Sequence, residues 1–419
     1  MPDSPEWMRG IRKRFDYGWR YDNVRGVLPD RTIMLDNGYA ELEREVQERG
    51  LARLAPLSCF QCGSCAALCP AGTGTTEKTG WSVRQTLHKM QLGLEHSEYD
   101  DIWLCTTCLR CSVDCPRGVD IADLLANLRK VRTALGVGAM PASIERAMKN
   151  IAGTGNPFGE SRERTEWAAG LDVPRFRRGM ELLYFPCCFN AYDSMAKGVA
   201  KATVRILSHS GVDFGILDSQ ERCCGESVRK AGDESLFRSL AQHNIGVFAE
   251  NGVRKILTNS PHCYKTFKSE YPGLGGEFEV IHSTQYFAQL IKDGRLKLTR
   301  RLNKRVTYHD PCYLGRHSGV YHEPRELLRA IPGLELVEMP DCGQRSLCCG
   351  GGGGRIWLDT QKGERLSDLR LEQAARTGAG VLATSCPYCL INFEDSRLTG
   401  PGEETIVTKD IAELLWEAL

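Results

Sequence analysis

The 419-residue chain lacks three features that would place it in common classes of protein. Its 54 Lys and Arg residues nearly balance its 53 Asp and Glu residues, so no excess of positive charge points to nucleic acid. It has no uninterrupted apolar run of about 18 residues, the length that a membrane-spanning helix needs. Its first residues lack the apolar core of a secretory signal. We therefore expect a cytoplasmic protein that binds no nucleic acid and meets a membrane only at its cytoplasmic face, through a partner subunit.

Cysteine, by contrast, is abundant and unevenly distributed. Nineteen cysteines are present, and most of them stand in short clustered motifs. Small secreted scaffolds spread their cysteines over much shorter chains and pair them as disulfides. Clusters of thiols in a long chain are instead typical of metal sites in a reducing compartment.

The most regular motif is C-x2-C-x2-C-x3-C-P, which occurs twice with the same spacing. Bacterial ferredoxins with two clusters use this run, and the fourth cysteine of each motif ligates the other cluster. We therefore predict two [4Fe-4S] cubanes. One is held by Cys59, Cys62, Cys65 and Cys115, and the other by Cys105, Cys108, Cys111 and Cys69. Zinc sites have no use for this duplicated spacing with its following prolines.

Two stretches of helical periodicity accompany these motifs. In Trp81–Gly93 and the residue after it, the apolar positions are Val83, Leu87, Met90 and Leu94, and Val119–Leu135 is similar. We place a two-cluster ferredoxin domain at residues 57–135, after an N-terminal arm (1–56) and before a linker (136–179). The arm contains a short charged helix at Ala40–Arg49, and it either docks on a partner subunit or packs on its own domain.

A second kind of site is predicted around Ser346–Gly354, where two adjacent cysteines run into five glycines. Adjacent thiols suit an assembly of several metal atoms better than one tetrahedral zinc. Glycines let the backbone approach a bulky inorganic group and offer N–H donors to it. The alternative, a glycine-rich loop with buried free cysteines, does not explain the cysteines at Cys312, Cys386 and Cys389. The run is not G-x-G-x-x-G, so we expect no dinucleotide site and an electron donor that is another protein.

This cysteine pattern is the second copy of an internal repeat. Its landmarks lie 124 to 126 residues after their counterparts, Cys188, Cys223, Cys224 and Cys263. We predict two α/β repeats, residues 180–300 and 301–419. Strands at Lys255–Thr258 and Gly380–Ala383 should each precede a helix that begins near a proline, Pro261 or Pro387. Ligands at the carboxyl ends of strands and at helix N-termini occupy the usual binding edge of such sheets.

The two copies are not equal. Ser260 stands where the second copy has Cys386, and Cys187 is an additional cysteine beside Cys188. The residues leave open whether Cys187 or Ser260 completes the first set. We expect the first copy to hold an ordinary cubane or no metal at all, and Cys342, which fits neither pattern, to have no role in a site.

The spacing C-x35-CC-x36-C-x2-C closely resembles the CCG domain of heterodisulfide reductases. The segments CFQCGSCAALCP and WLCTTCLRCSVDCPRGV are similar to the ferredoxin-like small subunit of the same enzymes. The resemblance implies a mostly helical two-cluster domain (α+β) fused ahead of two pseudo-repeated α/β CCG domains. It also implies a non-cubane [4Fe-4S] cluster in the second copy, held by Cys312, Cys348, Cys349, Cys386 and Cys389, and it leaves open a further iron–sulfur cluster on the four cysteines of the first copy.

The same resemblance implies a function. Electrons would enter from a membrane cytochrome b or a flavoprotein or hydrogenase-type subunit, and would reduce or form a disulfide of a small molecule or protein. The alternative is an electron relay in a quinone-linked glycerol-3-phosphate, lactate or glycolate dehydrogenase, and a scaffold with structural metals is a third reading. Among other residues, His309 is the candidate proton donor, ahead of His262 and His317, although each could simply donate a hydrogen bond. Arg355 either binds a substrate anion or pairs with Asp359.

Overall fold

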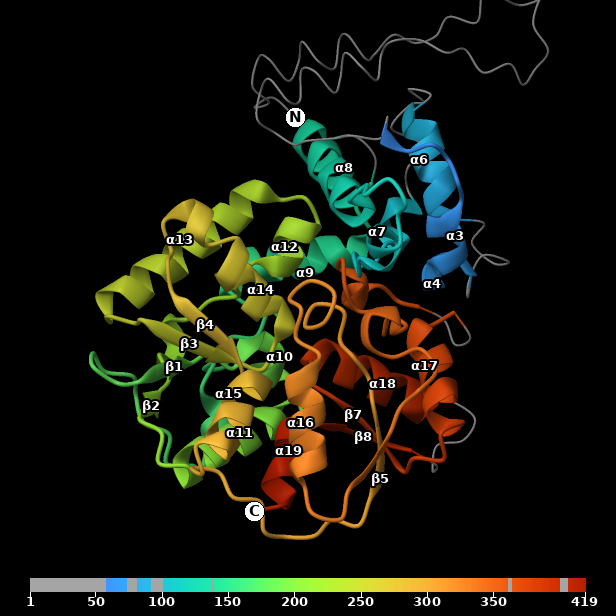
Figure 1. The fold of residues 1–419 in the computed structure, drawn as a ribbon. Coiled ribbons are helices and arrows are strands. Elements are labelled where there is room, and N and C mark those ends of the chain that lie inside the picture. The colour runs from blue at the N-terminus through green and yellow to red at the C-terminus, as the bar shows by residue number, and fades with distance from the viewer. Residues whose placement is uncertain (1–57, 74–80, 92–100, 137–138, 361–363, 400–405) are drawn as a thin grey trace, which may run out of the picture.

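A computed structural model of the chain describes residues 58–73, 81–91, 101–136, 139–360, 364–399 and 406–419. In it a small helical domain lies at one end of two α/β halves that stand side by side (Figure 1). The N-terminal arm, with the helix expected at Ala40–Arg49, lies outside the described residues.

The ferredoxin region is built from short helices. Its described residues form α3 (Ser64–Leu68), α4 (Pro70–Thr73), α6 (Val83–Gln91), α7 (Arg110–Val113) and α8 (Ile121–Leu135). Both predicted amphipathic helices are present, as α6 and α8, and each begins two residues later than expected. Val83, Leu87 and Met90 of α6 are buried as predicted, whereas Leu94 lies outside the described residues. Helix α8 begins after Asp120 because that side chain accepts a hydrogen bond from the N–H of Asp123.

The two repeats consist of alternating strands and helices. The strands of the first repeat are β1 (Leu182–Tyr184), β2 (Phe214–Gly215), β3 (Lys255–Thr258) and β4 (Glu279–His282). Its helices are α10 (Cys187–Tyr192), α11 (Lys197–His209), α12 (Glu226–Lys230), α13 (Glu234–Glu250), α14 (Pro261–Ser269) and α15 (Ser283–Lys292), with 3-10 turns η5 (Asp218–Gln220) and η6 (Pro272–Leu274).

The second repeat follows the same order. Its strands are β5 (Arg305–Tyr308), β6 (Glu335–Val337), β7 (Val381–Thr384) and β8 (Val407–Asp410). Its helices are α16 (His322–Ala330), α17 (Leu366–Ala375), α18 (Pro387–Thr399) and α19 (Ile411–Glu417), with 3-10 turns η7 (Gly343–Arg345) and η8 (Arg355–Trp357).

Each repeat contains one parallel four-stranded sheet, in the orders β2-β1-β3-β4 and β6-β5-β7-β8. The matching orders confirm the predicted pair of α/β repeats. Strand β3 has the predicted bounds, β7 begins one residue later than expected, and Pro261 and Pro387 begin their helices. The central strands β1, β3, β5 and β7 lead within a few residues to cysteines, so the predicted cysteine motifs stand at the carboxyl ends of both sheets.

The repeats pack on each other through helices at the centre of the molecule. Helices α11 and α15 of the first repeat contact α19 and α16 of the second (Figure 1). Leu182 of β1, Val306 of β5 and Leu414 of α19 belong to one apolar core that is shared by both sheets. Burial of such apolar side chains is the main term that holds the two halves together.

The segment expected as a linker is also structured. It contains α9 (Ala142–Thr154) and a 3-10 turn, η4 (Glu166–Ala168). The N–H of Cys223 donates to the carbonyl oxygen of Gly155 over 2.7 Å. This segment therefore packs directly against the cysteines of the first repeat.

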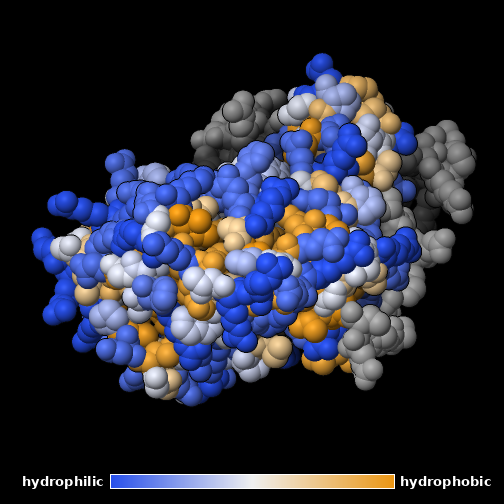
Figure 2. Space-filling model, turned by 60° about the horizontal axis from the view of Figure 1, so that its bottom comes forward, coloured by the Kyte–Doolittle hydropathy of each residue, from blue (hydrophilic) through white to orange (hydrophobic). Residues whose placement is uncertain are grey.

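Seen from the side of the C-terminus, the surface is largely hydrophilic, with separate apolar patches (Figure 2). The large apolar side chains exposed among the described residues are Phe60, Met195, Leu398, Val407 and Trp416. Among the same residues, no helix combines the length and the apolar character that crossing a membrane requires.

Candidate iron–sulfur sites

Cysteines of the two ferredoxin motifs lie beside one another in the structure. The thiols of Cys105, Cys108, Cys69 and Cys65 neighbour that of Cys111, so the third and fourth cysteines of the first motif both lie near the second motif. Cys65 has Cys59 and Cys62 as neighbours. Cys115 is half-buried at the end of α7, and its sulfur accepts the N–H of Val119 over 3.4 Å. Cys62 is exposed, whereas Cys105, Cys108 and Cys111 are buried.

Both ferredoxin motifs bend the backbone in the same way. Gln61 and Thr107, which occupy equivalent positions, have φ of 62° and 51°, in the left-handed region that non-glycine residues seldom enter. The N–H of each residue donates to the sulfur of the cysteine two residues earlier, over 3.4 and 3.3 Å. Donors aimed at sulfur stabilise thiolate charge, which is what a metal–thiolate site requires.

The five cysteines predicted in the second repeat meet in one buried set. Thiol contacts run from Cys312 to Cys348 and from Cys348 to Cys349. The sulfurs of Cys349 and Cys389 are 3.2 Å apart, and Cys389 in turn contacts Cys386. All five are buried.

The second set touches the ferredoxin domain directly. The thiol of Cys348 contacts that of Cys108 and lies 3.5 Å from the hydroxyl oxygen of Thr106. Arg316 donates to the carbonyl oxygen of Cys108 over 2.6 Å and to that of Ser346 over 2.7 Å. One side chain thus holds the backbone of both thiol sets in place.

The glycine run has a role that the sequence did not indicate. A Cβ on Gly352 would lie 2.3 Å from the carbonyl oxygen of Thr106, and one on Gly353 would lie 2.4 Å from that of Cys105. Real side chains never approach this closely. We predicted that the glycines make room for an inorganic group, but these two make room for the backbone of the ferredoxin domain.

In the first repeat five thiols also meet: the four predicted and that of Cys187, whose place the sequence left open. Cys188 contacts Cys223, and Cys223 contacts Cys224. Cys224 contacts Cys263, and Cys263 contacts Cys187. Ser260 lies in the same small cavity, and its hydroxyl oxygen accepts the N–H of Cys263 over 3.4 Å.

Buried arginines lie next to both thiol sets of the repeats, as the negative charge of an iron–sulfur group would require. Arg164 donates to the sulfur of Cys188 over 3.4 Å and pairs with the buried Glu221. Arg316 neighbours the thiols of the second set, and Arg355 lies among Cys348 and two ferredoxin cysteines. Each arginine has one buried nitrogen without a hydrogen-bond partner among the described residues. A buried donor of positive charge beside clustered thiols is suited to the negative sulfur atoms of a cluster.

His309 lies at the second set, within 4.8 Å of the sulfurs of Cys349 and Cys389. Its Nδ1 accepts a hydrogen bond from Arg370 over 3.2 Å, so the neutral ring carries its hydrogen on Nε2. Burial lowers the pKa of His309 well below its ordinary value, and the Arg370 cation lowers it further. The ring is therefore neutral and has a hydrogen-bond donor available near the thiols.

His262 belongs to the first repeat but contacts Cys386 of the second. Its ring is stacked between those of Tyr313 and Tyr388, with centroids 3.8 and 4.2 Å away. Burial opposes a charge on this ring, but the Glu226 carboxylate 3.2 Å away outweighs it and raises the pKa of His262 to about 10. The third candidate, His317, instead contacts the carbonyl oxygen of Thr107 through Nε2 over 2.8 Å.

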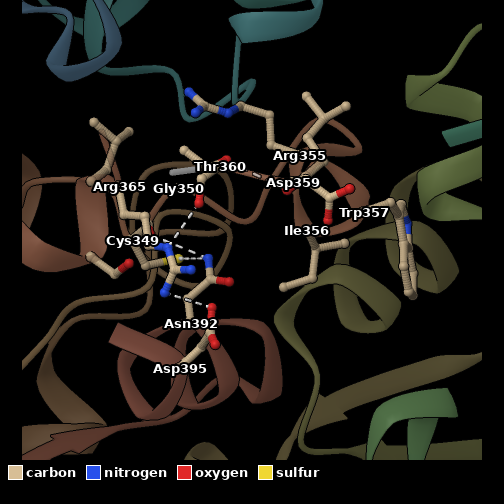
Figure 3. Close-up of a pocket in the computed structure, with 13 residues that line it drawn as sticks. Cys349, Gly350, Arg355, Ile356, Trp357, Asp359, Thr360, Arg365, Asn392 and Asp395 are labelled. Carbon is tan, nitrogen blue, oxygen red and sulfur yellow. Dashed lines mark hydrogen bonds and ion pairs between the residues drawn. The ribbon is translucent and has the colours of Figure 1, made fainter. Parts of the chain in front are cut away.

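A cavity of about 440 Å³ opens beside Cys349 (Figure 3). Asn392 donates to the carbonyl oxygen of Cys349 over 3.2 Å, and Arg365 pairs with Asp395 over 2.8 Å at the cavity wall. Arg355 also lines the cavity, but it donates to the carbonyl oxygen of Leu104. Its pairing with Asp359, one of the two alternatives that the sequence left open, is not among the ion pairs of the described residues. Cys342 is half-buried, outside both CCG thiol sets.

Comparison with known proteins identifies the two kinds of domain. A 4Fe-4S dicluster domain matches residues 55–119, and a cysteine-rich (CCG) domain matches residues 182–268 and 306–394. A subunit of the dihydromethanophenazine:CoB–CoM heterodisulfide reductase of Methanosarcina barkeri is 32% identical over 86% of this chain and 93% of its own length. The chain belongs to the same family as this heterodisulfide reductase subunit. As a member of this family, it is an iron–sulfur protein with a dicluster domain followed by two CCG repeats.

Other relatives are longer. The probable iron–sulfur-binding oxidoreductase FadF of Bacillus subtilis is 38% identical, and the EtfAB:quinone oxidoreductase of Syntrophomonas wolfei is 35% identical, each over 76% of this chain. This chain spans about half of their length, 47% in both cases. A solved structure of a hypothetical protein from Helicobacter pylori aligns with 98% of this chain and over 76% of its own length, at a TM-score of 0.45 and 10% identity.

Several residues of these sites carried no signal in the sequence. Arg164, Arg316 and Arg370 belong to no cysteine motif. Arg164 contacts a thiol, Arg316 the carbonyl oxygen of Cys108 and Arg370 the ring of His309, in each case only because of how the chain folds. Cys187 did carry a signal, as an extra cysteine next to a motif, but its thiol could be assigned to the first set only from its contacts.

Proposed function

We propose that this chain carries electrons from a partner protein to the second CCG repeat, where a disulfide is reduced or, in the opposite direction, formed. The contact between Cys108 and Cys348 carries the proposal, because it joins the thiols of the ferredoxin domain to those of the second repeat with no residue between them. Electron transfer becomes slower with distance, so two redox groups held on touching ligands exchange electrons readily.

The ligand assignment follows the sequence and is supported by the thiol contacts. The ferredoxin cysteines would hold two cubanes, with Cys69 serving the motif of Cys105 and Cys115 serving that of Cys59. Cys312, Cys348, Cys349, Cys386 and Cys389 would hold the non-cubane cluster. When bound, these groups pass single electrons, and the last also offers iron to a sulfur atom of the substrate.

The residues around the second set would bind and orient the disulfide. The cavity beside Cys349 would admit a substrate, and its wall presents the amide of Asn392 to polar groups. Nε2–H of His309 would donate a hydrogen bond to sulfur at the set, and because its ring is neutral it would orient that sulfur rather than supply the proton. Cleavage of one disulfide takes up two electrons and two protons and releases two thiols; the electrons come from the partner and the protons from solvent.

The partner would dock at the first ferredoxin motif. Cys62 is exposed there, and the neighbouring Phe60 is 58% exposed, the largest value among the exposed large apolar side chains of the described residues. An exposed aromatic ring beside an exposed thiolate is a suitable contact for another redox protein. Its chemical class would be a b-type cytochrome, which would bring the chain to the cytoplasmic face of a membrane, or a flavoprotein or hydrogenase-type subunit.

Turnover with an artificial donor tests the proposal. The anaerobic, cluster-loaded chain would be mixed with reduced methyl viologen and with cystine, glutathione disulfide or bis(2-sulfoethyl) disulfide. We expect at least one of these to yield two thiols for every two viologen radicals oxidised. Cys349→Ser should abolish this turnover and Cys342→Ser, outside the thiol sets, should keep it. Thiol release that is unchanged in Cys349→Ser would contradict the proposal.

The similarity to FadF and to an EtfAB:quinone oxidoreductase favours a second candidate, an electron relay to quinone beside a dehydrogenase. That function needs the same chain of redox groups but no disulfide in the cavity. Oxidation of the reduced chain by a soluble quinone, with no thiol released from any disulfide, would favour it.

A further inference from the structure

The two repeats differ at two positions that compensate each other. Cys187 of the first repeat corresponds to Pro311 of the second, and Ser260 corresponds to Cys386. At one position the first repeat has a thiol that the second lacks, and at the other the reverse holds. Each repeat consequently brings five thiols to the end of its sheet.

The contacts among these thiols follow the same order in both repeats. In the second repeat the order ends with Cys349, Cys389 and Cys386. In the first repeat it ends with Cys224, Cys263 and Cys187. Cys187 therefore contacts Cys263 as Cys386 contacts Cys389, although it belongs to a different part of the chain.

The backbone at Cys187 is strained in a way that serves this contact. Its φ is 69°, in the left-handed region, which residues with a Cβ seldom enter. Its side chain is nonetheless buried at the first position of α10. Pro311 of the second repeat is barred from this conformation because its ring fixes φ near −65°. A strained residue that points a thiol into a set of four others indicates a function for that thiol.

Ser260 has a structural role instead. It is the N-cap of α14, and its hydroxyl oxygen accepts the N–H of Cys263. Serine is a preferred residue at this position. A hydroxyl is also a hard ligand, in contrast to the soft thiolates that iron–sulfur clusters use.

A buried cation indicates that the first set is not merely a group of free thiols. Arg164 pairs with Glu221 over 3.1 Å and contacts the sulfur of Cys188, and both charged side chains are buried. Its Nη2 has no hydrogen-bond partner among the residues that the structure describes. A second, anionic acceptor at the thiols would satisfy this nitrogen.

We infer that Cys187 replaces the missing fifth thiolate, so that the first repeat holds an iron–sulfur group on Cys187, Cys188, Cys223, Cys224 and Cys263. The ligand has moved from the start of the helix after β3 to the start of the helix after β1. Both repeats then present five thiolates, so the serine at position 260 leaves the first repeat with as many thiolate ligands as the second. The inference concerns ligands only and holds whether or not the chain reduces disulfides.

Moving the ligand back tests this inference. Cys187→Ser should lose the group of the first repeat, and the double variant Cys187→Ser/Ser260→Cys should regain it, because a thiol then stands where the second repeat has Cys386. Iron and acid-labile sulfide per chain, together with Mössbauer spectra of the anaerobic full chain, provide the readout. The wild type should contain about 16 iron atoms, at four per cluster, and Cys187→Ser about 12. Cys342→Ser is the matched control, since it removes a half-buried thiol outside both CCG sets.

The outcomes separate clearly. Restoration of iron and of the Mössbauer pattern in the double variant supports the replacement, even if the single variant fails to fold. A Cys187→Ser protein with the full iron content and the wild-type spectrum would overturn it. A loss of iron that the double variant does not restore would also overturn it, as would a wild-type chain with only about 12 iron atoms.

Discussion

The carbonyl oxygen of Thr106 lies 2.3 Å from the place that a Cβ on Gly352 would occupy. The ferredoxin domain is thus seated on the glycine run of the second CCG repeat, backbone against backbone. This seat brings the thiol of Cys108 to that of Cys348. The same relationship makes the docking sensitive to single changes on either side.

Gly352→Ala should displace the ferredoxin domain from the second repeat. The methyl group would overlap the Thr106 carbonyl, and relief requires a backbone shift that costs about 1 to 3 kcal/mol. We expect iron content to remain near the wild-type value and electron transfer from the ferredoxin domain to the second repeat to become slower. Stopped-flow absorbance, recorded after the chain is mixed with a reductant, measures this electron-transfer rate. Gly246→Ala is the control, because a Cβ at this position of α13 would meet open space. Equal electron-transfer rates in the two variants would contradict the claim that the contact at Gly352 positions the ferredoxin domain.

Arg129 makes a second, independent prediction about the same interface. The side chain is fully buried and donates to the carbonyl oxygens of Cys105 over 2.8 Å and of Gly353 over 2.7 Å. Arg129→Met keeps most of the stem but leaves these carbonyls without their donor, at about 1 to 3 kcal/mol each. Thermal unfolding should show a clear loss of stability. Arg146→Met, on the exposed face of α9, should change stability by no more than about 0.5 kcal/mol. A similar loss in both variants would show that the hydrogen bonds of Arg129 across the interface do not contribute to stability.

Much of this architecture could be predicted from the sequence, and the missing parts have one physical cause. Periodicity located α6, α8 and β3, and cysteine spacing located the thiol set of the second repeat and four of the five thiols of the first. The seat at Gly352 was not foreseen because it depends on which backbone segment meets it, and that segment is about 250 residues away in sequence. The arginines at the thiols were missed for the same reason, since a buried cation carries no local pattern.

Stability should depend on pH through His282, the N-cap of α15. Burial lowers the pKa of His282 to about 4, whereas in the unfolded chain the value is about 6.5. Between these values the unfolded chain binds more protons, so the stabilisation is complete above pH 6.5 and is lost as the pH falls toward 4. At pH 5 the loss should be roughly 2 kcal/mol. His282→Asn keeps a capping side chain, and its urea midpoint should fall less between pH 7.5 and pH 5 than that of the wild type. Identical shifts of the urea midpoint in the two proteins would show that His282 does not cause the pH dependence.

The two ferredoxin motifs should respond differently to loss of a ligand. Cys62→Ser and Cys108→Ser should each remove about four iron atoms. Because only Cys108 contacts Cys348, its replacement should also alter the paramagnetic signals of the second repeat, whereas Cys62→Ser should leave them unchanged. Electron paramagnetic resonance of the partly reduced chain distinguishes the two. Intact iron in either variant would overturn the ligand assignment.

The central claim is that electrons from the ferredoxin domain reach a disulfide at the second repeat. It is tested most directly by a single turnover without any external donor. The anaerobic chain would be reduced, freed of excess reductant and mixed with a disulfide that the steady-state assay has shown to react, and the released thiols would be counted against the electrons lost. We predict two thiols for every two electrons in the wild type and none in Cys348→Ser. Loss of electrons from the reduced wild type without release of thiols, or equal thiol release in Cys348→Ser, would contradict the account.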